Sequence, residues 1–158
     1  MPLDTESPEP AHASFTIERV YPQAPARVFN AHADIGLKRR WFAEGDGFEL
    51  HHYALDFRVD GRETARFSFQ GGPEIVMEMV HQVIVPDRRI VIAYRMAVGE
   101  TPISASLSTI EFVPQGAGTR LIYTEQGIYF GGEGEIAGRE EGSRGLLENL
   151  AEVLAEQG

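Results

Sequence analysis

The strongest constraint on the fold is a series of alternating segments in the second half of the chain. Residues 75–85, 89–98, 103–113 and 119–128 alternate apolar and polar side chains over much of their length, and short turns separate them. Such alternation is typical of strands with one buried and one solvated face. Short turns join antiparallel neighbours, so this half of the chain predicts an antiparallel sheet.

A further hairpin is predicted upstream of this series. Leu55, Phe57 and Val59 alternate with polar residues, and the dipeptide Asp60-Gly61 follows them. Asp-Gly is typical of a two-residue hairpin turn, because both of its residues tolerate positive φ angles. The returning strand would continue the same apolar face.

The chain before this hairpin predicts one strand and two short helices. A strand is expected from Ser14 to Val20, and Pro22 ends it. Pro25 can open a helix, because proline suits the first helical turn. A second short helix is expected over residues 35–42.

A long amphipathic helix is predicted over residues 134–156. Its leucines fall within an arc of about 120°, and Gly138, Gly142 and Gly145 cluster along one edge of that arc. Each glycine costs a helix about 1 kcal/mol relative to alanine, so three interpretations are open: another element packs tightly there, the helix is kept slim over a cavity, or its first turns fray. Arg139 falls within the apolar arc, where it either extends out to solvent or pairs with an acidic ligand or a buried carboxylate.

Composition limits the function classes. The chain has 14 Lys and Arg against 24 Asp and Glu, for a net charge of −10, which disfavours nucleic acids and anionic membranes as partners. No cysteine is present, which excludes disulfides and thiolate chemistry. No apolar run approaches the ~20 residues that span a bilayer. We expect a flexible, acidic and proline-rich tail over residues 1–13, a single domain over residues 14–158, no membrane insertion, and a cytoplasmic location.

Several short motifs resemble the family named for the activator of the heat-shock-protein-90 ATPase, which belongs to the SRPBCC superfamily with START domains and the birch pollen allergen. The motifs lie in the same order as in that family, at residues 15–21, 24–29, 40–42, 118–121, 124–127 and 147–151. The resemblance implies an α+β helix-grip fold. A curved antiparallel seven-stranded sheet would wrap around the long C-terminal helix, with two short helices after the first strand and a cavity between sheet and helix.

The resemblance also implies a range of functions. Members of the superfamily bind lipids, sterols, polyketides and other apolar molecules in the cavity, and a few are cyclases or hydrolases, so the fold alone does not fix the function. The family often carries a tryptophan in the closing helix where this chain has Ser143. This departure predicts either a larger cavity or a gap filled from elsewhere. The resemblance allows a homodimer, of which the sequence carries no independent sign.

Polar and aromatic residues with inward phases are candidates for the ligand-binding wall. His81 alternates in phase with Met79, although a hydrogen-bonded core histidine is the simpler interpretation. Glu125 alternates in phase with Tyr123, and a buried carboxylate there would need a partner such as Arg139 or Arg95, or its pKa would rise. The full set of expected ligand-binding residues is Trp41, Phe67, Met79, His81, Tyr94, Tyr123, Glu125, Arg139 and Ser143.

The favoured function is therefore the binding of a small apolar or aromatic ligand, with no cofactor. A metal site is not expected, because His51 and His52 are adjacent and would point to opposite faces of a strand. One alternative is a stress-response or co-chaperone-like interaction protein that uses the basic run 38–40, although a solvated helix face is the simpler interpretation of that run. A second alternative is a cyclase-type or hydrolase-type enzyme with Glu125 or His81 as base.

Overall fold

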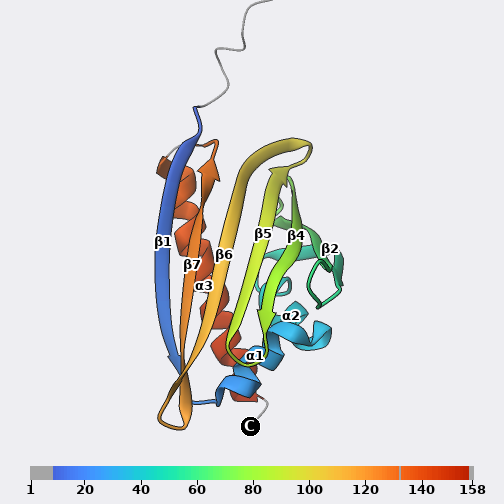
Figure 1. Ribbon diagram of the computed structural model, residues 1–158. Helices are drawn as coiled ribbons and strands as arrows, with labels where there is room; N and C mark the ends of the chain where they lie inside the picture. The colour runs from blue at the N-terminus through green and yellow to red at the C-terminus, as the bar shows by residue number, and fades with distance from the viewer. Residues whose placement is uncertain (1–8, 132, 157–158) are drawn as a thin grey trace, which may run out of the picture.

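A curved antiparallel sheet of seven strands and one long helix make up most of the molecule, as the computed structural model shows for residues 9–131 and 133–156 (Figure 1). The strand order in the sheet is β1-β7-β6-β5-β4-β3-β2. The strands are β1 (Ala11–Tyr21), β2 (Phe48–Leu55), β3 (Arg62–Phe69), β4 (Glu74–Val85), β5 (Arg89–Val98), β6 (Thr101–Gln115) and β7 (Gly118–Tyr129). The helices are α1 (Pro25–Ala33), α2 (Ile35–Phe42) and α3 (Glu133–Glu156). The predicted α+β helix-grip fold is confirmed.

The two short helices are fixed by local signals and by each other. Pro25 occupies the first turn of α1, and the side chain of Asp34 caps α2 by accepting a hydrogen bond from the Leu37 amide at 3.0 Å. The indole Nε1 of Trp41 in α2 donates to the Ala31 carbonyl in α1 at 2.8 Å. This bond orients the Trp41 ring toward the core.

The first strand begins earlier than expected. Residues 11–13 pair with residues 127–129 of β7, so β1 starts at Ala11 and not at Ser14. The predicted flexible tail therefore loses its last three residues to the sheet. Residues 9 and 10 are exposed and outside the strand, and the part of that prediction over residues 1–8 lies outside the residues that the structure describes.

The predicted two-residue hairpin at Asp60-Gly61 is wrong. The strand that precedes β3 is β2, over residues 48–55, and not the strand expected around Leu55, Phe57 and Val59. A six-residue connection, residues 56–61, joins β2 to β3. Phe57 in this connection packs edge-on against Phe29, with ring centroids 5.6 Å apart, and against His81 at 5.2 Å. Phe57 is thus partly buried in a loop, although the alternation around it resembles that of a strand.

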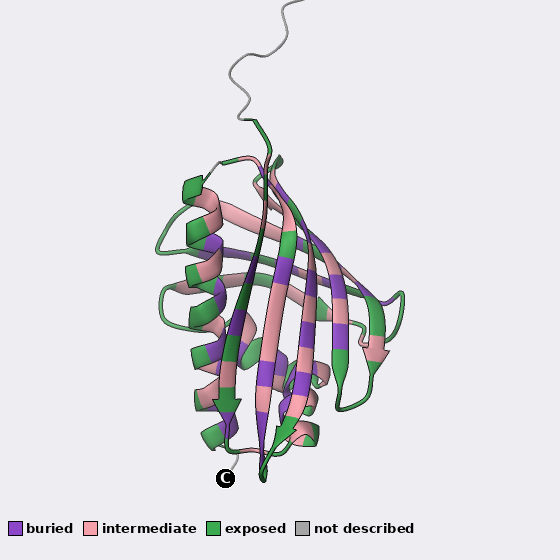
Figure 2. Cartoon of the chain, turned by 60° about the vertical axis from the view of Figure 1, so that its left-hand side comes forward, coloured by how far each residue is buried: buried purple, intermediate pink, exposed green. Residues whose placement is uncertain are grey.

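The long helix lies along the sheet near β1 and β7, with the short helices at one end (Figure 1). Buried residues alternate along the strands and gather on the side of α3 that is turned toward the sheet (Figure 2). Tyr21 on β1 donates its hydroxyl hydrogen to the Leu147 carbonyl on α3 at 2.8 Å and so ties the two together. In the part of the chain that the structure describes, no helix combines the length and apolarity needed to cross a bilayer.

Candidate ligand-binding pocket

A pocket of about 690 Å³ lies between the inner face of the sheet and α3. This volume falls in the range of pockets that hold drug-sized ligands. Most of the wall is apolar, and soft side chains such as Met77, Met79 and Met96 contribute to it. The aromatic part of the wall comes from several elements and comprises Trp41, Phe42, Phe48, Phe67, Phe69, Tyr94 and Tyr123.

The glycines of α3 face this space. Gly138, Gly142 and Gly145 line the pocket, and a Cβ atom built on any of them would meet no atom within 4 Å. Among the described residues, none comes within 4 Å of these Cβ positions, so tight packing at the three glycines is wrong. The three glycines are exposed, so the helix is slim along the open side of the pocket. Ser143, where the resembled family often has tryptophan, lines the same space.

The structure separates the nine expected ligand-binding residues into two groups. Glu125 and His81 do not line the pocket. The other seven do, and they are Trp41, Phe67, Met79, Tyr94, Tyr123, Arg139 and Ser143.

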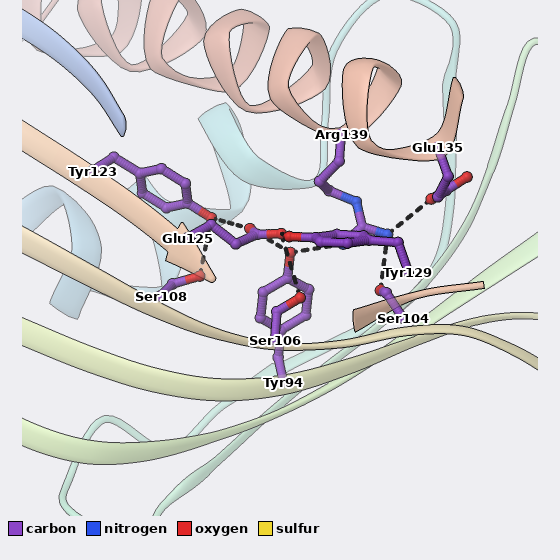
Figure 3. A network of polar contacts seen from close by, with 9 residues as sticks. All are labelled: Tyr94, Ser104, Ser106, Ser108, Tyr123, Glu125, Tyr129, Glu135 and Arg139. Carbon is purple, nitrogen blue, oxygen red and sulfur yellow. Dashed lines mark hydrogen bonds and ion pairs between the residues drawn. The ribbon is translucent and has the colours of Figure 1, made fainter. Parts of the chain in front are cut away.

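Glu125 lies beneath the pocket wall and is fully buried. Its carboxylate accepts hydrogen bonds from the hydroxyls of Tyr94 and Tyr123, each at 2.6 Å, and of Tyr129 at 2.7 Å (Figure 3). Ser106 contributes a longer hydrogen bond at 3.4 Å. A carboxylate offers about four acceptor sites, so these hydroxyls occupy nearly all of its capacity.

Arg139 completes this cluster from the helix side. Its Nη1 lies 3.4 Å from Glu125 Oε2 and donates to the Tyr94 hydroxyl at 3.0 Å (Figure 3). Its Nη2 donates to Ser104 Oγ at 2.9 Å and to Glu135 at 3.0 Å. Of the two interpretations of Arg139, extension to solvent is wrong and inward pairing with a buried carboxylate is right. Arg95, the other suggested partner, pairs instead with Glu78.

The tyrosines of the cluster are held in their neutral form. Burial first, and then the interaction with Glu125, raises the pKa of Tyr94 above its usual value and the pKa of Tyr129 to about 12. Burial likewise raises the pKa of Tyr123. These phenols are therefore hydrogen-bond donors at neutral pH, and the carboxylate they surround is satisfied and shielded. The arrangement suits a structural anchor better than a general base.

His81 is a hydrogen-bonded core histidine. Its Nδ1 lies 3.0 Å from the Gly61 carbonyl, and its Nε2 lies 3.7 Å from Glu63 Oε1. Its side chain keeps the phase of Met79 on the buried face, as expected, but it packs against the ring of Phe57 and does not line the pocket. The structure therefore fits a hydrogen-bonded core histidine and not a residue of the ligand-binding wall.

A second buried ion pair lies at the other end of the pocket. Lys38 Nζ is 3.2 Å from Glu63 Oε2, and both side chains are almost completely buried. The hydroxyl of Tyr53 donates to Glu63 at 2.6 Å, and Lys38 Nζ sits 4.5 Å from the centroid of the Phe42 ring. Lys38 also lines the pocket. The expected basic run is therefore not a uniform solvated face.

The other two cations of that run are exposed but paired. Arg39 Nε lies 2.6 Å from Glu44, and Arg40 pairs with Glu156 at the end of α3. Each arginine thus faces a carboxylate, and the run offers less positive charge to a partner than its sequence suggests.

Several polar residues of the site were missed, although the sequence held signals for some. Glu63 shares the alternation phase of Ala65 and Phe67, which face the core. The serines of β6 occur at every second position and continue the phase of Ile110 and Phe112; they are Ser104, Ser106 and Ser108, all buried. His32 lies one helical turn after the buried Val28, a spacing that places it on the core face of the first helix, where Trp41 and Phe112 pack around its ring.

Over residues 9–131 and 133–156, no group of three or more His, Asp or Glu side chains is placed to hold an ion.

Comparison with known proteins identifies relatives over nearly the whole chain. Mll3558 from Rhizobium loti is 55% identical, with a TM-score of 0.84, and the match covers 92% of this chain and 99% of that one. An uncharacterized protein from Rhizobium leguminosarum is 36% identical, with a TM-score of 0.88 and coverage of 94% and 97%. CV1439 from Chromobacterium violaceum, at 24% identity over 89% of this chain and 96% of that one, shares the fold with a TM-score of 0.76. No curated protein matches significantly.

The family assignment rests on a match to a whole-family model. Residues 23–155 match the model described as Activator of Hsp90 ATPase homolog 1-like protein. That stretch begins just before α1 and ends within the last turn of α3, so it includes every element that lines the pocket. The resemblance inferred from short motifs is confirmed, and the chain belongs to the Activator of Hsp90 ATPase homolog 1-like family.

Proposed function

We propose that this protein binds a small apolar or aromatic molecule in the pocket between the sheet and α3. The observation that carries the proposal is the bare face of Gly138, Gly142 and Gly145 over an apolar space. Glycines inside a helix cost stability, and here no packing contact offsets that cost. A ligand in the pocket would supply the missing contacts.

The two alternatives have less support. An enzyme that uses Glu125 or His81 as base would need that group beside the substrate, and neither lines the pocket. An interaction protein that uses residues 38–40 would need free cations. Lys38 is instead buried against Glu63, and Arg39 and Arg40 face carboxylates.

The proposal is tested by titrating the protein with N-phenylnaphthylamine, an uncharged dye whose fluorescence rises in apolar surroundings. We expect saturable binding to the wild type. Gly142→Leu adds a large side chain to the helix side of the pocket wall. It should weaken binding by about tenfold or more, an effect of about 1.4 kcal/mol or greater. Because leucine is a better helix former than glycine, this variant should stay folded.

Gly134→Leu is the matched control. Gly134 lies on the same helix and also has no atom near a built Cβ, but it does not line the pocket. This variant should bind the dye as the wild type does, and thermal melting should show that both variants are folded. The proposal fails if the wild type shows no saturable binding, or if the two leucine variants bind equally well.

A further inference from the structure

The charges around the pocket do not balance. In the described part of the chain, two cations and two carboxylates line it: Lys38, Arg139, Asp46 and Glu135. Each cation is already paired with a carboxylate from beneath the wall. Lys38 pairs with Glu63 at 3.2 Å and Arg139 pairs with Glu125 at 3.4 Å.

Glu135 and Asp46 are therefore surplus negative charges. Glu135 shares Arg139 with Glu125, lying 3.0 Å from Nη2, and its side chain is 29% exposed. Asp46 is exposed. Across the wall and the layer beneath it, two cations face four carboxylates.

The histidine that lines the described pocket wall cannot correct this imbalance. His32 lines the pocket, and its Nδ1 lies 2.9 Å from the Val28 carbonyl of the same helix. Burial, together with the positive charge of Lys38, lowers the pKa of His32 to about 3, so the ring is neutral at physiological pH.

From this balance we infer that the pocket selects a ligand without negative charge, either neutral or cationic. The inference rests on the proposed function and narrows its ligand class. A ligand carboxylate would leave water for a site where both terminal nitrogens of Arg139 are engaged by protein groups. It would also lie near the carboxylates of Glu135 and Asp46, whose charge the two cations of the wall do not fully neutralise. A cationic group would find those carboxylates and several aromatic faces.

Three naphthalene compounds of nearly equal size and different charge test the inference: naphthylmethanol, naphthylmethylamine and naphthoate. Each would compete with N-phenylnaphthylamine for the wild-type protein at pH 7. We expect naphthylmethanol and naphthylmethylamine to bind at least about tenfold more tightly than naphthoate.

Two charge-removing variants locate the effect. Glu135→Gln removes the surplus charge beside Arg139 and should raise the affinity for naphthoate relative to naphthylmethanol by about fivefold. Glu140→Gln removes the same charge from the same helix and also breaks an ion pair, with Arg144 at 2.9 Å, but it lies outside the pocket. It should leave the ratio unchanged.

The outcomes separate this inference from the proposed function. If the dye binds and naphthoate competes as well as naphthylmethanol, the charge selection is overturned and the binding function stands. If Glu135→Gln and Glu140→Gln shift the ratio equally, the selection does not arise at Glu135, and the inference is again overturned. If the dye itself does not bind the wild type, the proposed function fails and the inference falls with it.

Discussion

The guanidinium of Arg139 on α3 lies 3.4 Å from the carboxylate of Glu125 on β7, and both side chains are buried. The pair joins the helix to the sheet across the end of the pocket where the three tyrosine hydroxyls converge (Figure 3). Removing one member would leave the other as an uncompensated buried charge.

Arg139→Met should therefore lower the free energy of unfolding by about 3 kcal/mol. The double variant Glu125→Gln with Arg139→Met should be destabilised by less than the sum of the two single variants, because it buries no lone charge. Urea denaturation of the four proteins measures the coupling. Strict additivity would contradict the ion pair.

The glycines of the fold should respond to alanine in opposite directions. Gly142→Ala adds a side chain in open space and should stabilise the protein by up to about 1 kcal/mol. Gly127→Ala would place its Cβ 2.5 Å from the Ala105 carbonyl oxygen of the neighbouring strand. This clash should lower the free energy of unfolding by about 1 kcal/mol or more, as overpacked core substitutions do. Equilibrium unfolding in urea compares the two, and destabilisation by Gly142→Ala would show that the helix face is not free.

The basic run should divide into one structural residue and two surface residues. Lys38→Met leaves Glu63 buried without its cation and should cost about 3 kcal/mol. Arg39→Met breaks only an exposed pair with Glu44 and should cost less than about 1 kcal/mol. The difference in urea midpoint between the two variants measures this. Similar costs would mean that the burial of Lys38 has no energetic consequence.

Stability should fall as the pH drops from about 6.5 to 5, and His32 should account for part of the loss. The folded protein keeps His32 neutral down to about pH 3, since burial lowers its pKa, while the unfolded chain protonates it near its usual pKa of 6.5. The unfolded state thus binds more protons in this window, and the slope from one such group approaches about 1.4 kcal/mol per pH unit.

The variant His32→Gln should remove that part of the slope, whatever it does to the absolute stability. The control is His52→Gln, because His52 is exposed on β2. Urea titrations at several pH values within the window give the slopes. A slope in His32→Gln equal to that of the wild type would rule out the assignment to His32.

The order of strands and helices was largely predictable because period-two and period-3.6 patterns are local, and the family resemblance implied their helix-grip arrangement. The residues 35–42 of α2 and 89–98 of β5 match the expected bounds. The Asp60-Gly61 hairpin failed for a non-local reason, since Phe57 is drawn into contact with Phe29 and His81. The register shift next to His81 likewise depends on strand pairing, which no local signal marks.

The candidate pocket was predictable in its apolar wall and less so in its polar partners. Alternation placed Tyr94 and Tyr123 on the inner face, where they line the pocket. It could not say that Glu125 would be covered by three tyrosine hydroxyls, because Tyr94 comes from β5 and Tyr129 lies four residues further along β7. The Lys38–Glu63 pair joins residues 25 positions apart, so no local pattern brings them together.

The glycine face of α3 separates the stability of the fold from the shape of the pocket, two properties that the same core residues usually determine together. The sheet side of the pocket belongs to the packed interior, where a change in side-chain volume is felt by its neighbours. A Cβ atom added at position 138, 142 or 145 would meet no described atom within 4 Å, so side chains can be added there one at a time without repacking the strands. Selection, or an engineer, can therefore adjust the size and shape of the pocket from one helix while the folding of the domain stays nearly constant.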